Sequence, residues 1–283
     1  GVPHKILFLA NGHPALQARV AAQARGVEMV FLDTMDLWIK TEQEALRRVL
    51  REIDGLILND SEALQLTGRY NMIEAAGRIQ NETGLVTACH LTCIAHTRAE
   101  IYAVLGRLSA LGLRHLVALR GDAPKDQPVP PTRERDFGYA SDLVAHVKKR
   151  GGFRMAVAGY PETHPEAASP ADDLARFADK CAAGADWAIT QLFFDSASYF
   201  AFVKRARAAG VSVPVVPGIM PVTSYPQLKR FTAMCGARIP DELEARLAKV
   251  QSDPEAVIRE GVEWGARQCR ELLDGGAPGI HFY

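Results

Sequence analysis

The stretch HLVALRGDAPKDQP, residues 115–128, changes from apolar to charged within one step of the chain. Its first part, 115–120, has the apolar and branched residues that are typical of a buried strand. Arg120, Gly121 and Asp122 stand where that strand ends. Ligands of α/β proteins bind at the carboxyl ends of parallel strands. The stretch therefore predicts a strand whose end faces a ligand, followed by a long charged loop over 121–138.

Similar apolar runs recur along the whole chain and alternate with amphipathic segments. Several of these segments end at glycine just before the next strand, which is a usual helix stop. Repeated strand–helix units predict an α/β fold with a parallel sheet. The nine candidate strands fit a TIM (β/α)8-type barrel with one extra unit, or a barrel beside a small lobe. These strands are 5–10, 28–33, 55–59, 85–90, 115–120, 154–159, 187–194, 213–219 and 279–283.

The composition argues against several classes of partner. The chain has 283 residues, 48% of them hydrophobic, and its 33 basic residues balance 33 acidic ones. Without a net charge, we expect neither nucleic acid nor a membrane surface as a partner. No apolar run approaches the roughly 20 residues of a membrane span, and no signal peptide is expected at the N-terminus. The five cysteines form no CxxC pair, so we expect a reducing, cytoplasmic location.

Polar and aromatic side chains follow five of the candidate strands. In a parallel array the strand ends share one edge, so side chains far apart in sequence converge there. Amides, aromatic rings and a few charges are the composition of a small-molecule pocket. The residues are His90, Arg120, Asp122, Tyr160, Glu162, His164, Glu166, Gln191, Phe193, Phe194, Gln227 and Phe231.

Each of these residues also has an ordinary structural interpretation. Asp122 alone is explained as well by a structural role, as a turn cap or as an ion-pair partner of Arg120, as by a functional one. Single histidines such as His90 and His164 are more often structural than catalytic. A metal site built on either histidine lacks a closed set of ligands at zinc-like spacing, so no metal is predicted.

Over residues 81–283 the chain resembles the methylenetetrahydrofolate reductases, flavin enzymes of one-carbon metabolism. The resemblance rests on short sequence motifs that occur in the family's order and spacing. They are NETGL, HLTCI, HLVALRGD, YASDLV, VAGYPETHPEA, AGADWAITQLFFD, PVVPGIMPV and RIP. It implies a (β/α)8 barrel that binds FAD at its C-terminal face, with NAD(P)H and the folate taking turns beside the flavin. The implied reaction is the reduction of 5,10-methylenetetrahydrofolate to 5-methyltetrahydrofolate. We also expect a homo-oligomer.

The resemblance implies roles for individual residues. Asp122 would be catalytic, because a fixed carboxylate stabilises the cationic methylene-iminium form of the folate. Arg120 and Lys180 suit the FAD diphosphate, and Gln191 offers a donor and an acceptor to the pterin. The implied folate or nicotinamide site comprises Gln191, Gln227 and Phe231. The implied FAD site comprises His90, Arg120, Gly121, Asp122, Tyr139, Ala140, Tyr160, His164, Asp173 and Lys180.

Residues 1–80 do not show this resemblance. The family's opening Phe-Glu-Phe-Phe-Pro word, whose glutamate is its general acid, is absent, as is the Thr-Tyr-Gly-Ala word of its second strand. Instead, FLDTMDLWI and LILNDSEALQLTG resemble ribokinase-type carbohydrate kinases. We therefore expect a chimera of two parts, 1–80 and 81–283, joined inside one helix.

In this hypothesis the kinase-like strands 28–33 and 55–59 fill the first two barrel positions, and 5–10 is an addition. Asp33, Asn59 and Asp60 would then stand at the rim of the barrel, which is the edge formed by the carboxyl ends of its strands. They receive no catalytic role, because a displacement of about 1 Å costs on the order of 100-fold in rate. Losing the general acid lowers the reaction rate roughly 100- to 10,000-fold. The alternatives are a chimeric barrel scaffold without turnover, which at most binds FAD or phosphate, and, last, a sugar or nucleoside kinase.

Overall fold

The computed structural model describes residues 6–9, 13–23, 29–58, 60–122 and 135–283. The chain forms two compact units. Unit 1 is Gly1–Cys89 with Ala99–His115, and unit 2 is His90–Arg98 with Leu116–Tyr283. Asn59 and most of the charged loop predicted over 121–138 lie outside the described residues.

Unit 1 contains a three-stranded parallel sheet in the order β1 (Ile6–Leu9), β2 (Met29–Asp33) and β3 (Gly55–Ile57). Leu32 in the central strand pairs with Leu9 on one side and with Leu56 on the other. It is fully buried in a core to which Leu46 and Val49 also belong. The helices of this unit are α1 (Pro14–Gln23), α2 (Asp36–Thr41), α3 (Gln43–Val49), α4 (Asp60–Thr67), α5 (Met72–Thr83) and α6 (Arg98–Ala110), whose first residue belongs to unit 2.

The expected junction at 80–81 falls inside the continuous helix α5. Asn71 caps its N-terminus by accepting the N–H of Ile73 at 2.9 Å, and Gly84 ends it with φ of +76°. The amide of Gln80 donates to the carbonyl of Gly112 at 3.1 Å, which ties the end of α5 to the turn after α6. The residues on both sides of position 80 therefore belong to one helix, as the pattern predicted.

Unit 2 is built on a five-stranded sheet whose order follows the chain, β4–β5–β6–β7–β8. β6, β7 and β8 are parallel neighbours, as are β9 and β10. Sequential order is typical of a (β/α) barrel, whereas the order reverses in a doubly wound sheet. The predicted α/β, barrel-type class is confirmed. The strands are β4 (Ala88–Thr92), β5 (His115–Leu119), β6 (Arg154–Gly159), β7 (Trp187–Thr190), β8 (Val215–Val216), β9 (Gly218–Ile219) and β10 (His281–Phe282).

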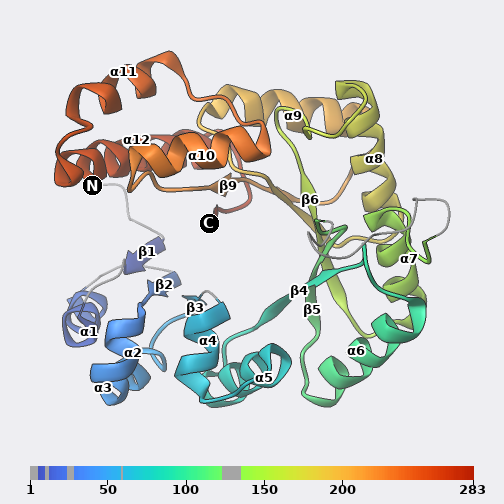
Figure 1. Cartoon of the computed structure of the whole chain (residues 1–283), viewed down its shortest axis with the longest axis horizontal. Helices are drawn as coiled ribbons and strands as arrows, with labels where there is room; N and C mark the ends of the chain where they lie inside the picture. The colour runs from blue at the N-terminus through green and yellow to red at the C-terminus, as the bar shows by residue number, and fades with distance from the viewer. Residues whose placement is uncertain (1–5, 10–12, 24–28, 59, 123–134) are drawn as a thin grey trace. The chain divides into compact units, whose positions relative to one another are not determined.

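The helices that connect these strands pack side by side. Figure 1 shows α7 (Ala140–Arg150), α8 (Pro170–Ala182) and α9 (Ser196–Ala208) following one another around the outside of the strands, with α8 in contact with both neighbours. β6 ends at Gly159, where a Cβ would lie 3.0 Å from ring atoms of both Phe177 and Phe202. Glycine therefore lets α8 and α9 approach the end of β6 closely.

The part of unit 2 between β9 and β10 is helical. It consists of α10 (Tyr225–Cys235), α11 (Asp241–Val250) and α12 (Pro254–Asp274). α12 is anchored to the segment after β7, because Trp264 Nε1 donates to the carbonyl of Phe194 at 3.1 Å and Gln268 donates to that of Phe193 at 2.9 Å. Within the described ranges, no helix combines the length and the apolar character that crossing a membrane requires. The five cysteines, all of them described, are free thiols.

Candidate active site

A paired cation stands at the carboxyl end of β5. Arg120 directly follows this strand, and its Nη1 donates to the Glu166 carboxylate at 2.6 Å. This ion pair raises the pKa of Arg120 and lowers that of Glu166. Asp122 and Tyr160 also act electrostatically on the guanidinium, so they lie near it. Residues that follow β5 and β6 are thereby brought together.

An aromatic wall and an amide adjoin this cation. Tyr160 is the first residue after β6; burial raises the pKa of its hydroxyl, and its hydrogen bond with Gln191 opposes that effect. Gln191 directly follows β7, and its Oε1 accepts the N–H of Leu192 at 2.9 Å. The ring of His164 meets that of Tyr160 edge to face, with centroids 4.6 Å apart. These contacts fix the orientation of both rings and of the amide.

The helix α8 supplies Asp173 and Lys180. One Asp173 oxygen accepts the main-chain N–H of His164 at 3.0 Å, which holds the loop after β6. Lys180 Nζ donates to the carbonyl of Ala158 at 2.5 Å. Burial of the ammonium lowers the pKa of Lys180 to about 8, although the charge of Asp173 opposes this shift. Lys180 therefore connects α8 to β6, and its predicted contact with a diphosphate stays a prediction.

Lys180→Met should remove a pH dependence of stability between pH 8 and 10.5. The pKa of Lys180 falls from 10.5 to about 8 on folding, so in this range the unfolded chain keeps a proton that the folded chain has lost. Wild-type stability therefore rises with pH. One pKa unit corresponds to about 1.4 kcal/mol, and the Lys180 side chain is only partly enclosed. The free energy of unfolding of the wild type should therefore rise by about 2 kcal/mol relative to that of the variant across this range. Urea unfolding at both ends of the range measures the difference.

A matched control for this substitution is Lys249→Met. Lys249 is an exposed lysine on α11, and removing it should leave the pH dependence of unfolding as it is in the wild type. If the free energy of unfolding changed equally with pH in the wild type and in Lys180→Met, the Lys180 ammonium would be shown to be solvated in the folded protein.

Three more of the predicted residues lie near the start of α7 and the end of β5. Gly121 has φ of +83°, and a Cβ there would lie 2.8 Å from Cβ of Thr92, so the position requires glycine. Tyr139 is the N-cap of α7 and is 41% exposed, and the guanidinium of Arg176 lies 4.0 Å from its ring centroid. Ala140 is buried as the first residue of the helix. Tyr139 thus presents a ring to solvent, whereas Ala140 does not present its side chain.

The placement of His90 at a strand end was wrong. The strand was expected over 85–90, but β4 runs over Ala88–Thr92, so His90 lies in its middle with an exposed side chain. The apolar Leu85 suggested an earlier start, yet it packs in the core of unit 1. A contact of His90 with a cofactor stays a prediction.

Gln227 and Phe231 lie on α10, not directly after a strand. They are four residues apart on this helix and so share a face. Gln227 is exposed and Phe231 is half-buried. The guanidinium of Arg230 lies 5.3 Å from the ring centroid of Phe231. Their predicted contacts with the folate or nicotinamide stay predictions.

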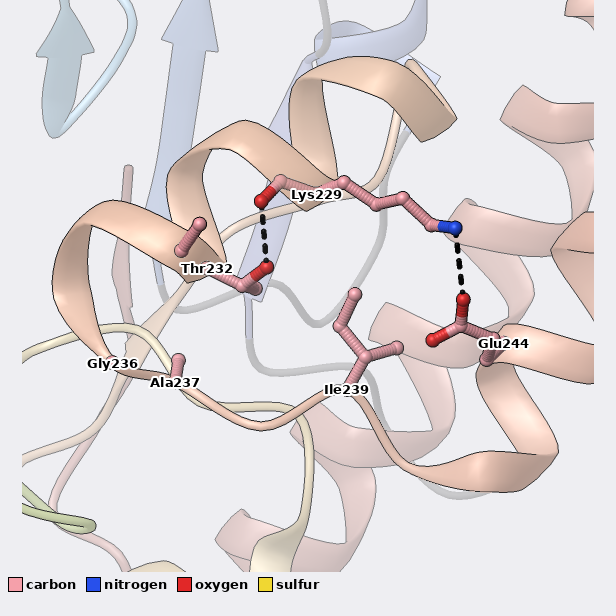
Figure 2. A pocket seen from close by; sticks show the side chains of 7 residues that line it. Lys229, Thr232, Gly236, Ala237, Ile239 and Glu244 are labelled. Atoms are coloured by element: carbon pink, nitrogen blue, oxygen red, sulfur yellow. Dashed lines mark hydrogen bonds and ion pairs between the residues drawn. The ribbon is translucent and has the colours of Figure 1, made fainter.

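A hollow of about 390 Å³ lies on another face of α10 (Figure 2). Lys229 Nζ lies 3.0 Å from a carboxylate oxygen of Glu244 across it, and the hydroxyl of Tyr225 donates to the same oxygen at 2.7 Å. Lys229 is about half a turn away from both Gln227 and Phe231 around the helix. The hollow is therefore separate from the predicted folate face of α10.

Comparison with known proteins identifies the family. The family model described as methylenetetrahydrofolate reductase matches residues 65–283. The chain belongs to the methylenetetrahydrofolate reductase family. It is 40% identical over 205 residues to the 5,10-methylenetetrahydrofolate reductase of Pectobacterium carotovorum, covering 72% of this chain and 67% of that protein. Residues 65–80, which the sequence words left outside the resemblance, belong to the matched region.

Eukaryotic members of the methylenetetrahydrofolate reductase family are longer than this chain. Methylenetetrahydrofolate reductase (NADH) 1 of Zea mays is 36% identical over 222 residues, which are 75% of this chain and 37% of that protein. The Probable methylenetetrahydrofolate reductase (NADPH) of Caenorhabditis elegans is 37% identical over 203 residues, which are 71% of this chain and 30% of that protein. The chain thus spans less than half the length of these relatives.

A solved structure shares the fold of this reductase-family chain. It is an uncharacterised protein from Clostridium thermocellum that binds two copies of 5-methyl-5,6,7,8-tetrahydrofolic acid. The TM-score is 0.52 at 14% sequence identity, covering 99% of this chain and 88% of that one. At this identity the likeness is one of fold.

Glu166 was among the residues expected at the strand ends of this family member, but its pairing with Arg120 was not expected. Tyr283 was not among the predicted residues. The hydroxyl of Tyr283, at the end of β10, donates to the carbonyl of Thr190 at 2.9 Å, and burial raises the pKa of Tyr283 to about 12. The position of Tyr283 at the end of the candidate strand 279–283 was a signal that could have identified it. Among the described residues, no group of three or more His, Cys, Asp or Glu side chains is placed to hold a metal ion.

Proposed function

We propose that this chain reduces 5,10-methylenetetrahydrofolate to 5-methyltetrahydrofolate with NAD(P)H through a bound FAD. The observation that carries the proposal is the cluster of polar and aromatic side chains at the ends of β5, β6 and β7 in a member of this family, namely Arg120, Asp122, Tyr160 and Gln191. The folate bound by the Clostridium protein of similar fold supports the substrate class. Relatives carry either NADH or NADPH in their names, so both nicotinamides need testing.

The residues present at the rim fit a flavin nucleotide. The Arg120 side chain is 31% exposed and is held in place by Glu166, and the planar set of N–H donors of a guanidinium suits a diphosphate. Tyr160 and His164 offer ring surfaces, and Gln191 offers an amide to a heterocycle. Bound FAD supplies the hydride-transfer chemistry. The protein's contribution is to hold and orient the rings and to exclude water.

Asp122 has the clearest electrostatic role in this proposal. It is the third residue after β5, two positions beyond Arg120, and it is exposed. The methylene-iminium form of the folate carries a positive charge, and a fixed carboxylate beside it lowers its free energy. The effect is largest once bound ligands exclude water from the rim, because screening then falls. Gln191 would orient the pterin by donating and accepting hydrogen bonds.

We propose further that β2 and β3 supply the first two strands of the barrel, with β1 as an addition. The parallel, sequential order β1–β2–β3 supports this arrangement, as does the sequential order of β4–β8. The kinase-like motifs in residues 1–80 support a chimeric origin. Because the family match begins at residue 65, the junction between the two parts would lie closer to that residue than to residue 80. A crystal structure in which β3 and β4 exchange hydrogen bonds would support the arrangement, and one in which residues 1–80 form a separate lobe beside an open sheet would overturn it.

Purified protein reconstituted with FAD should show the visible absorbance of oxidised flavin. Under anaerobic conditions, NADH or NADPH should bleach that absorbance, and 5,10-methylenetetrahydrofolate should then restore it. The three observations test flavin binding, the nicotinamide step and the folate step in turn. Light scattering of the same sample tests the proposed homo-oligomer.

The scaffold alternative makes a different prediction in this experiment. A barrel that binds FAD without turnover would become coloured and would not be reoxidised by the folate. Protein that stays colourless after reconstitution, or that bleaches with NAD(P)H and never reoxidises with folate, would overturn the proposed activity. The family assignment would be unaffected by either result.

A further inference from the structure

The loop that follows β6 contacts the C-terminal end of α10. We call residues 160–167 the β6 loop and residues 235–238 the α10 end. A carboxylate oxygen of Glu162, in the loop, accepts the main-chain N–H of Arg238, in the α10 end, at 2.8 Å. This N–H lies beyond the last residue of the helix. The hydrogen bond therefore fixes the point at which the chain leaves α10.

Packing brings the same two segments together a second time. Gly236 caps α10 with φ of +75°, and a Cβ there would lie 3.2 Å from Cγ of Pro165 and 3.6 Å from the carbonyl oxygen of Thr163. Tyr160 and Cys235 line a common cavity of about 10 Å³, which is room for about one water molecule at most. The α10 end is thus fitted closely against the β6 loop.

The β6 loop is itself held from two other sides. Arg205 of α9 donates to the carbonyl of Pro161 at 3.1 Å, and Asp173 of α8 accepts the N–H of His164. Glu162 is half-buried between these attachments, and burial raises the pKa of its carboxyl. Leaving a half-buried acceptor without a donor costs more free energy than leaving an exposed acceptor unpaired. Glu162 therefore connects the end of α10 to a loop that is itself held in place by α8 and α9.

The helix α10 carries Gln227 and Phe231, the two residues predicted to contact the folate or nicotinamide. They share one face of the helix. A helix of this length moves largely as one body, so the position of its end determines the position of this face. A displacement of about 1 Å in a substrate-positioning group can cost on the order of 100-fold in rate.

We propose that Glu162 is a positioning residue, which holds the α10 end on the β6 loop and thereby places Gln227 and Phe231 for substrate binding. The kinetic consequence rests on the proposed function, whereas the mechanical part depends only on the contacts above. The acceptor oxygen is the essential feature, because its partner is a main-chain N–H. The negative charge of the carboxylate is not required.

The test compares Glu162→Ala with Glu162→Gln by hydrogen exchange and by steady-state kinetics. Glu162→Ala removes the acceptor, so main-chain exchange over residues 232–238 should accelerate about ten-fold. The KM for 5,10-methylenetetrahydrofolate should rise about ten-fold, while flavin absorbance and its bleaching by NAD(P)H stay unchanged. Glu162→Gln keeps an acceptor oxygen and should restore both exchange and KM to near the wild-type values.

Two further variants keep the test decisive. Glu255→Ala removes an exposed glutamate of α12 and should change neither readout. Gly236→Ala strains the α10 end from the helix side, because L side chains rarely adopt its φ of +75°, and should also raise the folate KM. It keeps the Glu162 side chain, so it tests the same contact if Glu162→Ala fails to fold.

Three results would overturn the proposal. The first is exchange in Glu162→Ala that matches Glu255→Ala, the second is equal impairment of Glu162→Ala and Glu162→Gln, and the third is faster exchange with an unchanged folate KM. A wild-type protein that binds no flavin or never reduces the folate would instead overturn the proposed function. In that case the exchange comparison still decides whether Glu162 holds the α10 end.

Discussion

Asp122→Asn should lower the rate of folate reduction by the flavin-loaded protein about 100-fold. The substitution keeps the size of the side chain and removes its charge. The cationic form of the folate then loses a fixed counter-charge that acts strongly where ligands exclude water. Removing one preorganised group of this kind typically costs roughly 100- to 1,000-fold. Anaerobic stopped-flow absorbance, which follows flavin reduction by NAD(P)H and reoxidation by the folate separately, measures the effect.

The nicotinamide step provides an internal control for this prediction. Only the step that involves the folate cation should slow strongly in Asp122→Asn. Asp274→Asn changes an exposed aspartate at the end of α12 and should leave both steps as in the wild type. An unaffected folate step would contradict the role of Asp122, and an equal loss in both steps would indicate that its charge acts on the flavin.

Gly261→Ala should destabilise the protein by about 3 kcal/mol, although alanine is the better helix former. Gly261 lies inside α12, where a Cβ would sit 1.9 Å from the carbonyl oxygen of Val222 and 2.7 Å from its carbonyl carbon. Main-chain atoms cannot rotate out of the way, so the helix or the segment around Val222 must shift. Overpacking of a close contact costs about 1–3 kcal/mol and occasionally more. Urea unfolding followed by circular dichroism gives the change in free energy.

Gly265→Ala is the matched substitution for this measurement. Gly265 lies one turn further along α12, and a Cβ there has no neighbour within 4 Å. Alanine should therefore stabilise the helix at this position by about 0.5–1 kcal/mol. Changes of opposite sign at the two glycines would show that α12 is seated against Val222. Stabilisation by both substitutions would contradict that contact.

Strands bounded by clear signals could be predicted closely from sequence. β6 was expected over 154–159 and occupies Arg154–Gly159, because two glycines stand shortly before it and a Tyr-Pro pair follows it. β4 was misplaced because the run 85–87 has strand-like composition although Leu85 serves the core of unit 1. Hydrophobicity shows that a residue is buried and does not show in which core it is buried.

The candidate site was partly predictable for a similar reason. A position directly after a strand is a local property, so Arg120, Tyr160 and Gln191 could be placed at strand ends. The partners of these residues depend on the path of the chain in three dimensions. Glu166 contacts Arg120 across 46 positions, and Tyr283 contacts Thr190 across 93. No spacing rule connects such pairs, and the ligand roles of the strand-end residues stay predictions.

The ion pair of Arg120 with Glu166 turns anion binding at the rim into an exchange. Arg120 Nη1 already has a carboxylate oxygen at 2.6 Å, so an arriving phosphate must displace Glu166 from that nitrogen before it gains the same donor. The observed affinity is then the difference between two ion pairs, and free phosphate, which brings few other contacts, gains little. In the proposed site, Glu166 would thus compete with the ligand for Arg120 and favour ligands large enough to bind other residues of the site as well.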